Sequence, residues 1–258
     1  MLAMASLSLQ TGNSLEGFRQ TFRFANFSDA LSQNGEFFIR SLRNAAVVTS
    51  VALLLAYPVA YWIAFYAGRF KSVVLFLLLL PFFISFVIRT VAWSFILSDS
   101  GIIFGTLKDI GLLPENYRVL GTTLAVVAGI TYNLLPFTIL PLYVSLEQID
   151  ERLIEAAEDL YASKLHAFLR VTLPLSLPGV VAGTLLTFIP AAGDFINAQL
   201  LGSPRNHMIG NVIQSKFLEL TDYPSAAAMS FVLMAAILVF VFVYARQVGT
   251  EQLTGTAV

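Results

Sequence analysis

Five stretches of this chain carry almost no charge, and they constrain its fold more than any other feature. They cover residues 44–68, 72–98, 119–146, 171–193 and 223–245, and only Arg89, in the second stretch, interrupts them. Each is long enough to cross the hydrocarbon core of a bilayer, which needs about 20 apolar residues in a helix. The whole chain is 57% hydrophobic and 12% charged, against about 25% charged residues in ordinary soluble domains. The sequence therefore predicts a membrane protein.

The uncharged stretches predict helices rather than the strands of a membrane barrel. Barrel strands are about 10 residues long and alternate in polarity, whereas runs such as VVTSVALLLAYPVAYWIAFY are apolar throughout. Such segments must satisfy their backbone hydrogen bonds internally, as helices do. We therefore expect an all-α membrane protein with five transmembrane helices, near residues 44–67, 72–97, 120–145, 172–192 and 224–245.

The remaining residues divide around these helices. We expect residues 1–43 to form an N-terminal extramembrane segment, residues 44–245 the transmembrane domain, and residues 246–258 a cytoplasmic tail. The first residues, MLAMASLSL, lack the basic leader of a signal peptide and the apolar length of a span. Either the protein starts there, or a helix that precedes this segment is missing from the sequence.

Several chemistries are excluded by residues that the chain lacks. It has no cysteine, so thiolate nucleophiles and cysteine metal sites are absent. Its two histidines fall in connecting segments, no G-x-S-x-G or H-E-x-x-H protease motif occurs, and no G-x-x-x-x-G-K-[ST] loop is available to bind ATP phosphates. A net charge of -1 gives no reason to expect nucleic acid as a partner. We expect neither a catalytic site nor a metal site in this chain.

One charged segment, residues 147–172, lies between two of the predicted spans. Between Glu147 and Asp159 it holds six acids and one base. On a helix its apolar residues share one face; these are Ile149, Leu153, Ala156, Ala157 and Leu160. Ser163 is suited to cap a second helix, and Pro174 ends the segment where the chain enters the membrane. The pattern predicts a helix, a turn and a helix, which is either a docking element for a basic groove or a solvated loop.

The charged segment resembles a motif of a known transporter family. Glu155-Ala156-Ala157, followed at a long and specific spacing by Val171-Thr172-Leu173-Pro174, is similar to the EAA loop of permease subunits of binding-protein-dependent ABC importers. Across roughly residues 36–245 the chain resembles the polyamine (spermidine and putrescine) branch, through LLPFFISFVIRTVAWSFIL, YNLLPFTILPLYVSLEQID, LPLSLPGVVAGTLLTFIPAAGDF and LLGSPRNHMIGNVIQSKF. The resemblance implies a type I ABC importer permease fold with a cytoplasmic helix-turn-helix coupling loop.

The same resemblance implies the partners. In that family the loop rides in a cleft on a dimer of ABC ATPase subunits, which bind ATP and Mg, so this chain would bind no cofactor itself. A second permease subunit, similar but not necessarily identical, completes the path through the lipid bilayer, and a separate extracytoplasmic protein binds the substrate. The residues that match the coupling loop are Glu155, Ala156, Ala157, Asp159, Tyr161, Ser163, Leu173 and Pro174.

Location and orientation also follow from the resemblance. It implies a multi-pass protein of the bacterial inner membrane, and a sixth helix ahead of the five, of which the first residues of this chain would be the end. With the 147–172 loop in the cytoplasm, six Lys and Arg residues lie inside and eight outside. This balance does not follow the usual bias of basic residues toward the cytoplasm, so the orientation rests on the resemblance.

Tyr161 departs from the family pattern. The family has glycine at this position, where the chain turns between the two helices of the loop. Glycine reaches positive φ angles at little cost, whereas a bulky residue there is an outlier. Either the turn avoids that conformation in this protein, or the ATPase cleft has a matching change.

Polar residues within or beside the spans are candidates for the translocation path. Arg89 is the one charge well inside a span, and such a charge is functional, paired or extended toward the membrane surface. Asp194, at the end of the fourth span, is its candidate partner. Tyr132 and Asn133 interrupt the third span and either line the path or form hydrogen bonds between helices.

The substrate class rests on the family branch. We expect a polyamine, while iron, thiamine, sulfate or an aminophosphonate remain alternatives within the ABC importers. A secondary transporter is the alternative from another class. It usually shows repeated halves and ionisable groups near the middle of the membrane, and this sequence offers neither beyond Arg89.

Overall fold

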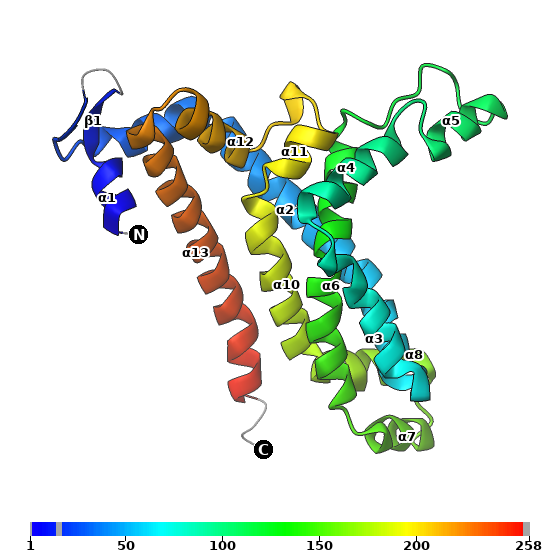
Figure 1. Cartoon of the computed structure of the whole chain (residues 1–258). Coiled ribbons are helices and arrows are strands. Elements are labelled where there is room, and N and C mark those ends of the chain that lie inside the picture. The colour runs from blue at the N-terminus through cyan, green and yellow to red at the C-terminus, as the bar shows by residue number, and fades with distance from the viewer. Residues whose placement is uncertain (1, 14–16, 255–258) are drawn as a thin grey trace. The chain divides into compact units, whose positions relative to one another are not determined.

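A computed structural model describes residues 2–13 and 17–254 of the chain, and these residues are mostly helical (Figure 1). The longer helices are α2 (Ala25–Phe65), α4 (Phe86–Leu97), α6 (Thr123–Glu147), α10 (Leu177–Ala192) and α13 (Tyr223–Thr254). Short helices connect them: α1 (Leu2–Ser8), α3 (Lys71–Leu79), α5 (Ile102–Asp109), α7 (Glu151–Asp159), α8 (Lys164–Ala167), α9 (Leu173–Leu175), α11 (Ile196–Leu201) and α12 (Ile209–Gln214). The strands β1 (Gln10–Asn13) and β2 (Gly17–Gln20) form an antiparallel pair in which Gln10 faces Gln20.

Four of the described helices are long and apolar enough to cross a membrane, and a bent pair adds a fifth candidate. The four segments are Ala25–Phe65, Phe86–Asp109, Thr123–Glu147 and Tyr223–Arg246. The bent pair consists of Lys164–Leu175 and Leu177–Ala192, which meet at an angle of 63°. The expected all-α membrane fold is therefore confirmed.

The second predicted span differs in its bounds, because residues 72–97 do not form one continuous helix and the candidate span in this region is Phe86–Asp109. Helix α3 ends at Leu79, the 3-10 turn η2 (Leu80–Phe83) follows, and α4 begins only at Phe86. Pro81 has no N–H group to continue the helical hydrogen bonds, and Ile84 is extended, with φ -95° and ψ 136°. The run of residues 72–97 is therefore completely broken at residues 80–85.

The described chain forms two compact units, each with its own packing. Unit 1 contains residues 1–46, 90–130 and 189–258, and unit 2 contains residues 47–89 and 131–188. In unit 1, a cluster of buried apolar side chains joins the start of α2 to α12 and α13: Ala30, Phe38, Ile209, Met229 and Leu233. The Ser41 hydroxyl accepts a hydrogen bond from the Ile209 backbone N–H at 2.8 Å, which secures the start of α12 on α2.

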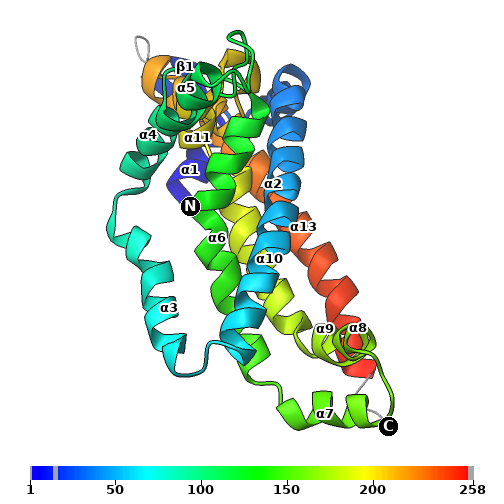
Figure 2. The same cartoon turned by 90° about the vertical axis from the view of Figure 1, so that its right-hand side faces the viewer.

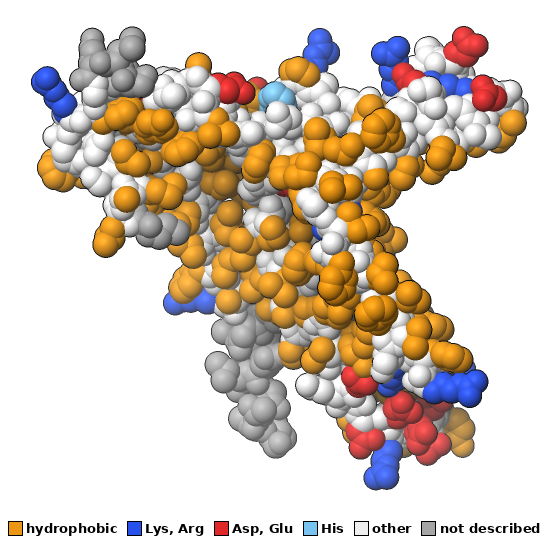
Figure 3. Space-filling view, in the orientation of Figure 1, with side chains coloured by type: hydrophobic (Ala, Val, Ile, Leu, Met, Phe, Trp, Pro, Cys, Tyr) orange, Lys and Arg blue, Asp and Glu red, His pale blue; other side chains and the backbone are white. Residues whose placement is uncertain are grey.

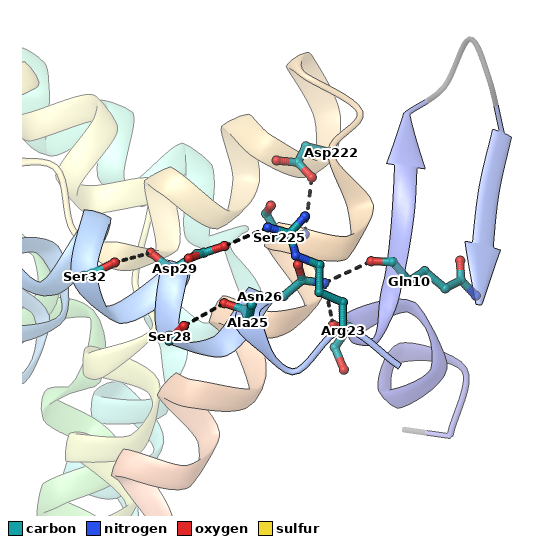
Figure 4. A network of polar contacts seen from close by, with 10 residues as sticks. Gln10, Arg23, Ala25, Asn26, Ser28, Asp29, Ser32, Asp222 and Ser225 are labelled. Carbon is teal, nitrogen blue, oxygen red and sulfur yellow. Dashed lines mark hydrogen bonds and ion pairs between the residues drawn. The ribbon is translucent and has the colours of Figure 1, made fainter. Parts of the chain in front are cut away.

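A polar network holds the N-terminal elements of unit 1 together (Figure 4). The Asn26 amide donates to the backbone carbonyls of Ser8 and Gln10, both at 2.9 Å. It thereby links α2 to α1 and to the first strand. Nearby, an Asp222 carboxylate oxygen accepts from the Ser225 N–H at 3.3 Å in the first turn of α13.

The helix α2 runs without interruption through residues 43 and 44, where the sequence suggested a boundary.

Unit 2 is built on a close contact between α6 and α10. Gly179 and Gly183 form a G-x-x-x-G pair on α10, a spacing that lets two membrane helices approach closely. A Cβ atom at Gly179 would lie 2.6 Å from the Ser145 Cβ and 2.7 Å from the Pro141 carbonyl oxygen of α6. Further along the same contact, the hydroxyls of Thr138 and Thr187 form a buried hydrogen bond of 2.7 Å. These small residues fix α6 and α10 to each other.

Candidate functional site

The charged segment begins with an ion pair and a helix cap. At the end of α6, the Glu147 carboxylate lies 3.4 Å from the Lys71 ammonium at the start of α3. The Asp150 carboxylate then accepts a hydrogen bond from the Arg152 backbone N–H at 3.0 Å. Asp150 is therefore the N-cap of α7, and it satisfies one of the free N–H groups at this helix start.

Helix α7 is amphipathic, but neither of its faces is buried. None of its residues is buried, and the apolar side chains of Leu153 and Leu160 are 49% and 81% exposed. The acids gather over α7, as the red atoms at the lower right of Figure 3 show. Glu155, Ala156 and Asp159 are exposed as well, and Ala157 is half-buried. An apolar face that this chain leaves uncovered points to contact with another protein.

The turn after α7 places Tyr161 in the left-handed region, with φ of 61°. The Tyr161 N–H donates to the Glu158 carbonyl at 2.9 Å, and the Ala162 N–H donates to the Ala157 carbonyl at 3.1 Å. These two bonds define a Schellman motif, in which the residue with positive φ is usually glycine. The interpretation that the turn avoids this conformation is therefore wrong. The Tyr161 side chain is fully exposed, so no contact with the described part of the chain compensates the strain.

Helix α8 starts directly after this turn and lies beside α7 (Figure 2). Its N-cap is Ser163, as predicted: the Ser163 hydroxyl accepts from the His166 N–H at 3.4 Å and also contacts His166 Nδ1 at 2.8 Å. A π-helical turn, η3 (Phe168–Thr172), and α9 follow. Leu173 is half-buried and Pro174 is exposed, and both belong to α9.

An aromatic cluster anchors the second half of the loop on α2. The Phe168 ring packs edge-on against Tyr57 and Tyr61, with centroids 5.5 and 6.0 Å apart. The Tyr57 hydroxyl also lies 2.7 Å from the hydroxyl of Ser176, the buried residue at the 63° bend. Sequence reasoning missed this joint, because Tyr57 and Ser176 are 119 positions apart and each is unremarkable in its own segment.

Arg89 lies in the first turn of α4, at the broken span. Its side chain is 92% buried, and its guanidinium lies over the rings of Phe82 and Phe86, 5.2 and 5.8 Å from their centroids. The Phe82 ring in turn packs edge-on against Phe137 of α6, at 5.0 Å. The Arg89 Nε atom is buried and has no hydrogen-bond partner among the described residues. Arg89 is therefore held by aromatic faces within unit 2.

The other candidates for the path have different surroundings. On α6, Tyr132 is exposed while the neighbouring Asn133 is buried, so the two side chains do not line one surface of unit 2. In unit 1, both carboxylate oxygens of Asp194 accept hydrogen bonds from Asn197, from its backbone N–H at 2.9 Å and its amide at 2.8 Å. Burial raises the pKa of Asp194 to about 6, although these hydrogen bonds oppose the shift. Arg89 and Asp194 belong to different units, and their pairing stays a prediction.

Comparison with known proteins decides the family. A family model described as "Binding-protein-dependent transport system inner membrane component" matches residues 49–248, which is well over half of the chain. The chain belongs to this family. As a member, it is a multi-pass inner-membrane permease component of a bacterial ABC importer, whose ATPase is a separate subunit. The predicted family, location and non-enzymatic role are thereby confirmed.

Individual relatives of this inner-membrane component include polyamine permeases. The chain is 41% identical over 206 residues to the spermidine/putrescine transport system permease protein PotB of Haemophilus influenzae, covering 80% of this chain and 72% of the relative. It is 39% identical over 211 residues to PotB of Escherichia coli K12, covering 82% and 77%. It is also 33% identical to the E. coli inner membrane ABC transporter permease protein YdcU over 253 residues, covering 92% and 77%.

Solved structures support the same fold for this family member. A bacterial ABC transporter involved in the import of the acidic polysaccharide alginate has a chain that matches with a TM-score of 0.71 at 21% identity, covering 96% of this chain and 89% of that chain. The MetNI methionine ABC transporter matches with a TM-score of 0.56 at 18% identity, covering 84% of this chain and 93% of that chain.

Within the described residues, no group of three or more His, Asp or Glu side chains is placed to hold a metal ion.

Proposed function

We propose that this chain is a permease subunit of a polyamine importer and forms half of the translocation path. The observation that carries the proposal is the 41% and 39% identity to two PotB permeases over about four fifths of the chain. The solved transporters are only 21% and 18% identical to this chain and therefore support only the fold. One of them imports an acidic polysaccharide, which differs chemically from a polyamine. The substrate assignment therefore depends on the relatives and needs a direct test.

The second part of the proposal is that the 147–172 loop docks on a separate ATPase in the cytoplasm, where ATP and Mg²⁺ bind. The exposed apolar side chains of Leu160, Tyr161 and Leu165 offer the contact surface, and acidic side chains gather at the same end of the molecule (Figure 3). Apolar side chains beside acidic ones suit a partner cleft that has both apolar and basic residues. Glu155, Ala156 and Asp159, exposed on α7, are the motif residues that would contact the ATPase.

The third part concerns how movement of the loop reaches the membrane. Phe168 and Ser176 both contact Tyr57, so the loop and the lower half of α2 are joined at two points. On the other side, Gly179 of α10 packs directly against Ser145 and the Pro141 carbonyl of α6. ATP-driven closure of the ATPase dimer would then move these helices as one rigid body and alternate the access of the path.

Two further partners complete the proposed transporter. A second permease subunit, which is either another copy of this chain or a similar protein, would supply the other wall of the path. A separate substrate-binding protein would deliver the polyamine from the outside, and the alginate transporter has been solved with such a periplasmic protein bound. Arg89, Tyr132, Asn133 and Asp194 are the candidate residues of the path.

Reconstitution tests the function directly. The complete complex, with an ATPase, a second permease and a binding protein that copurify with this chain, is placed in liposomes and supplied with ATP and labelled spermidine. We expect ATP-dependent uptake that unlabelled putrescine reduces and that iron, thiamine, sulfate and aminophosphonate do not. Uptake of one of those four solutes instead would replace the substrate. Uptake driven by an ion gradient without the ATPase would favour a secondary transporter.

A further inference from the structure

A groove in unit 2 lies where α6 ends and the 147–172 loop begins. It is lined by residues between Pro141 and Gln148 on α6, between Ile149 and Leu153 at the start of the loop, and between Leu175 and Ala182 on α9 and α10. Its volume is about 610 Å³, and small-molecule sites measure about 300–1,000 Å³. Along α6 it extends for about 10 Å, from Pro141 to Gln148. The groove is therefore large enough for a small aliphatic molecule.

The parts of the groove differ in chemistry. The part on α9 and α10 is apolar and consists of Leu175, Pro178, Gly179 and Ala182. The part on α6 and the loop adds polar side chains, namely Ser145, Gln148 and Asp150. Among the described residues that line the groove, Asp150 is the one with a charge. The groove is thus apolar along α10 and negative where the loop begins.

The polar groups of the groove are hydrogen-bond acceptors that this chain leaves available. Among the described residues, nothing forms a hydrogen bond with the Ser145 hydroxyl or the Gln148 side-chain amide. Asp150 accepts the Arg152 N–H through Oδ1, so its Oδ2 stays open to a ligand. An alkylammonium group has three N–H donors and no acceptor, and hydroxyl, amide and carboxylate oxygens all accept. The lining therefore suits an ammonium group.

The composition of the groove distinguishes between its possible occupants. Asp150 would repel an anion such as sulfate. A lipid acyl chain or an apolar helix of the second permease would cover Gln148 and Asp150 without partners for them, which costs free energy. A chain of methylene groups with ammonium ends matches both parts, because the methylene groups pack on α10 and an ammonium pairs with the carboxylate.

We propose that this groove is a release site, which holds an alkyl polyammonium substrate at the cytoplasmic end of the path before it leaves. The site rests on the proposed import of polyamines and names where their release begins. Asp150 and Leu153 belong to the 147–172 loop, so movement of α7 on the ATPase would change the shape of the groove. Because Asp150 is exposed, its attraction for a cation is weak, as release requires.

Cysteine protection tests binding without relying on transport. The chain contains no cysteine, so Val144→Cys places a single thiol of this chain in the groove. In the complete complex without ATP, the rate at which an uncharged maleimide alkylates this chain is measured as spermidine is added. We expect spermidine to slow the reaction severalfold, and butylamine or sodium chloride at the same ionic strength to have no such effect. Tyr66→Cys is the matched control: residue 66 is 67% exposed and lies in unit 2 outside the groove, so spermidine should not protect it.

Further substitutions separate the charge of the groove from its shape. Asp150→Asn keeps the N-cap of α7, because asparagine caps as well as aspartate, and it should raise the spermidine concentration for half protection about three- to fivefold. Ala182→Leu narrows the apolar part and should also weaken protection. Glu158→Gln removes the same charge at the other end of α7, outside the groove, and should leave protection unchanged. The amount of this chain in the membrane shows that each variant folds.

Three results would each overturn the release site. If Val144→Cys fails to react even without spermidine, lipid or the second permease covers the groove. If butylamine or salt protects equally well, the effect is charge screening. If Asp150→Asn leaves protection unchanged, the carboxylate is not a ligand. The uptake assay is independent: spermidine uptake without protection would remove this site alone, whereas protection without spermidine uptake would refute the proposed substrate alone.

Discussion

Substitution of Gly179 by alanine is the most direct test of the contact between α6 and α10. The added Cβ would lie 2.6 Å from the Ser145 Cβ, 2.7 Å from the Pro141 carbonyl oxygen and 3.1 Å from the Leu142 Cα. Two of these atoms are backbone, so no side chain can rotate away, and the helices must separate by about 0.7 Å to reach an ordinary contact distance.

The expected loss of stability follows from two opposing effects. Overpacking of this kind costs about 1–3 kcal/mol. Alanine favours a helix over glycine by up to about 1 kcal/mol. With the full helix gain subtracted, the net loss is about 0–2 kcal/mol, which corresponds to a shift of up to roughly 30-fold in the unfolding equilibrium. Gly183→Ala should cost less, because the nearest atom there, the Thr138 carbonyl oxygen, is 3.2 Å away.

The assay is an SDS unfolding titration of the purified chain in mixed micelles, from which free energies of unfolding are compared. Gly35→Ala is the matched control: it is the same substitution within helix α2, where the new Cβ meets no atom within 4 Å. It should leave stability unchanged or raise it by up to about 1 kcal/mol. Ser145→Gly should rescue Gly179→Ala only in part, because the Pro141 oxygen remains. A Gly179→Ala variant as stable as Gly35→Ala would refute the close packing described above.

Four further predictions concern the loop and the path. Tyr161→Gly should relieve about 1 kcal/mol of left-handed strain at the end of α7 and preserve or improve transport; hydrogen exchange of α7 and an uptake assay check this, and a large loss of uptake with normal assembly would mean that the ring makes its own contact. Tyr57→Phe removes the hydrogen bond to Ser176, worth about 1 kcal/mol, and should lower substrate-stimulated ATPase severalfold with unchanged basal activity; an unchanged stimulation would count against the joint. If Arg89 and Asp194 pair, Arg89→Ala should be rescued in part by Asp194→Ala, whereas strictly additive defects in a double-mutant cycle of uptake would reject the pairing. Because burial raises the pKa of Asp194 from 3.8 to about 6, the folded carboxyl binds a proton between these two pH values that the unfolded carboxyl releases, so stability should rise as the pH falls through 6 toward 3.8, and melting curves of Asp194→Asn should lack this contribution.

The sequence predicted those features that depend on neighbouring residues. Uncharged runs located most of the spans, and the acids and small apolar residues located helix α7 of the 147–172 loop, since both patterns repeat along one helix. The cap by Ser163 was predicted for the same reason, because its partner, the His166 N–H, is three residues away. Only the glycine that the family has at this position suggested a positive φ angle for Tyr161. The identity of the residue did not predict it, because a bulky side chain disfavours that angle.

Features that depend on contacts between distant segments were not predictable. Hydropathy treats residues 72–97 as one run, and Pro81 alone did not distinguish a kink from the break between α3 and α4. The joint between Tyr57 and Ser176 links α2 to the start of α10, and neither segment contains a signal for the other. The aromatic surroundings of Arg89 likewise involve Phe137 of α6, through its contact with Phe82, and arise only when the helices pack.

The glycine contact sets a limit on how this protein can evolve as well as on how it moves. From Gly179 to Thr187, about 12 Å of α10 lies directly against α6. Two helices so matched cannot slide past each other without separating, so the push on α7 that we propose would become a tilt of both. Any lineage that enlarges residue 179 must therefore reshape the Pro141 turn of α6 at the same time, and the two positions should change together.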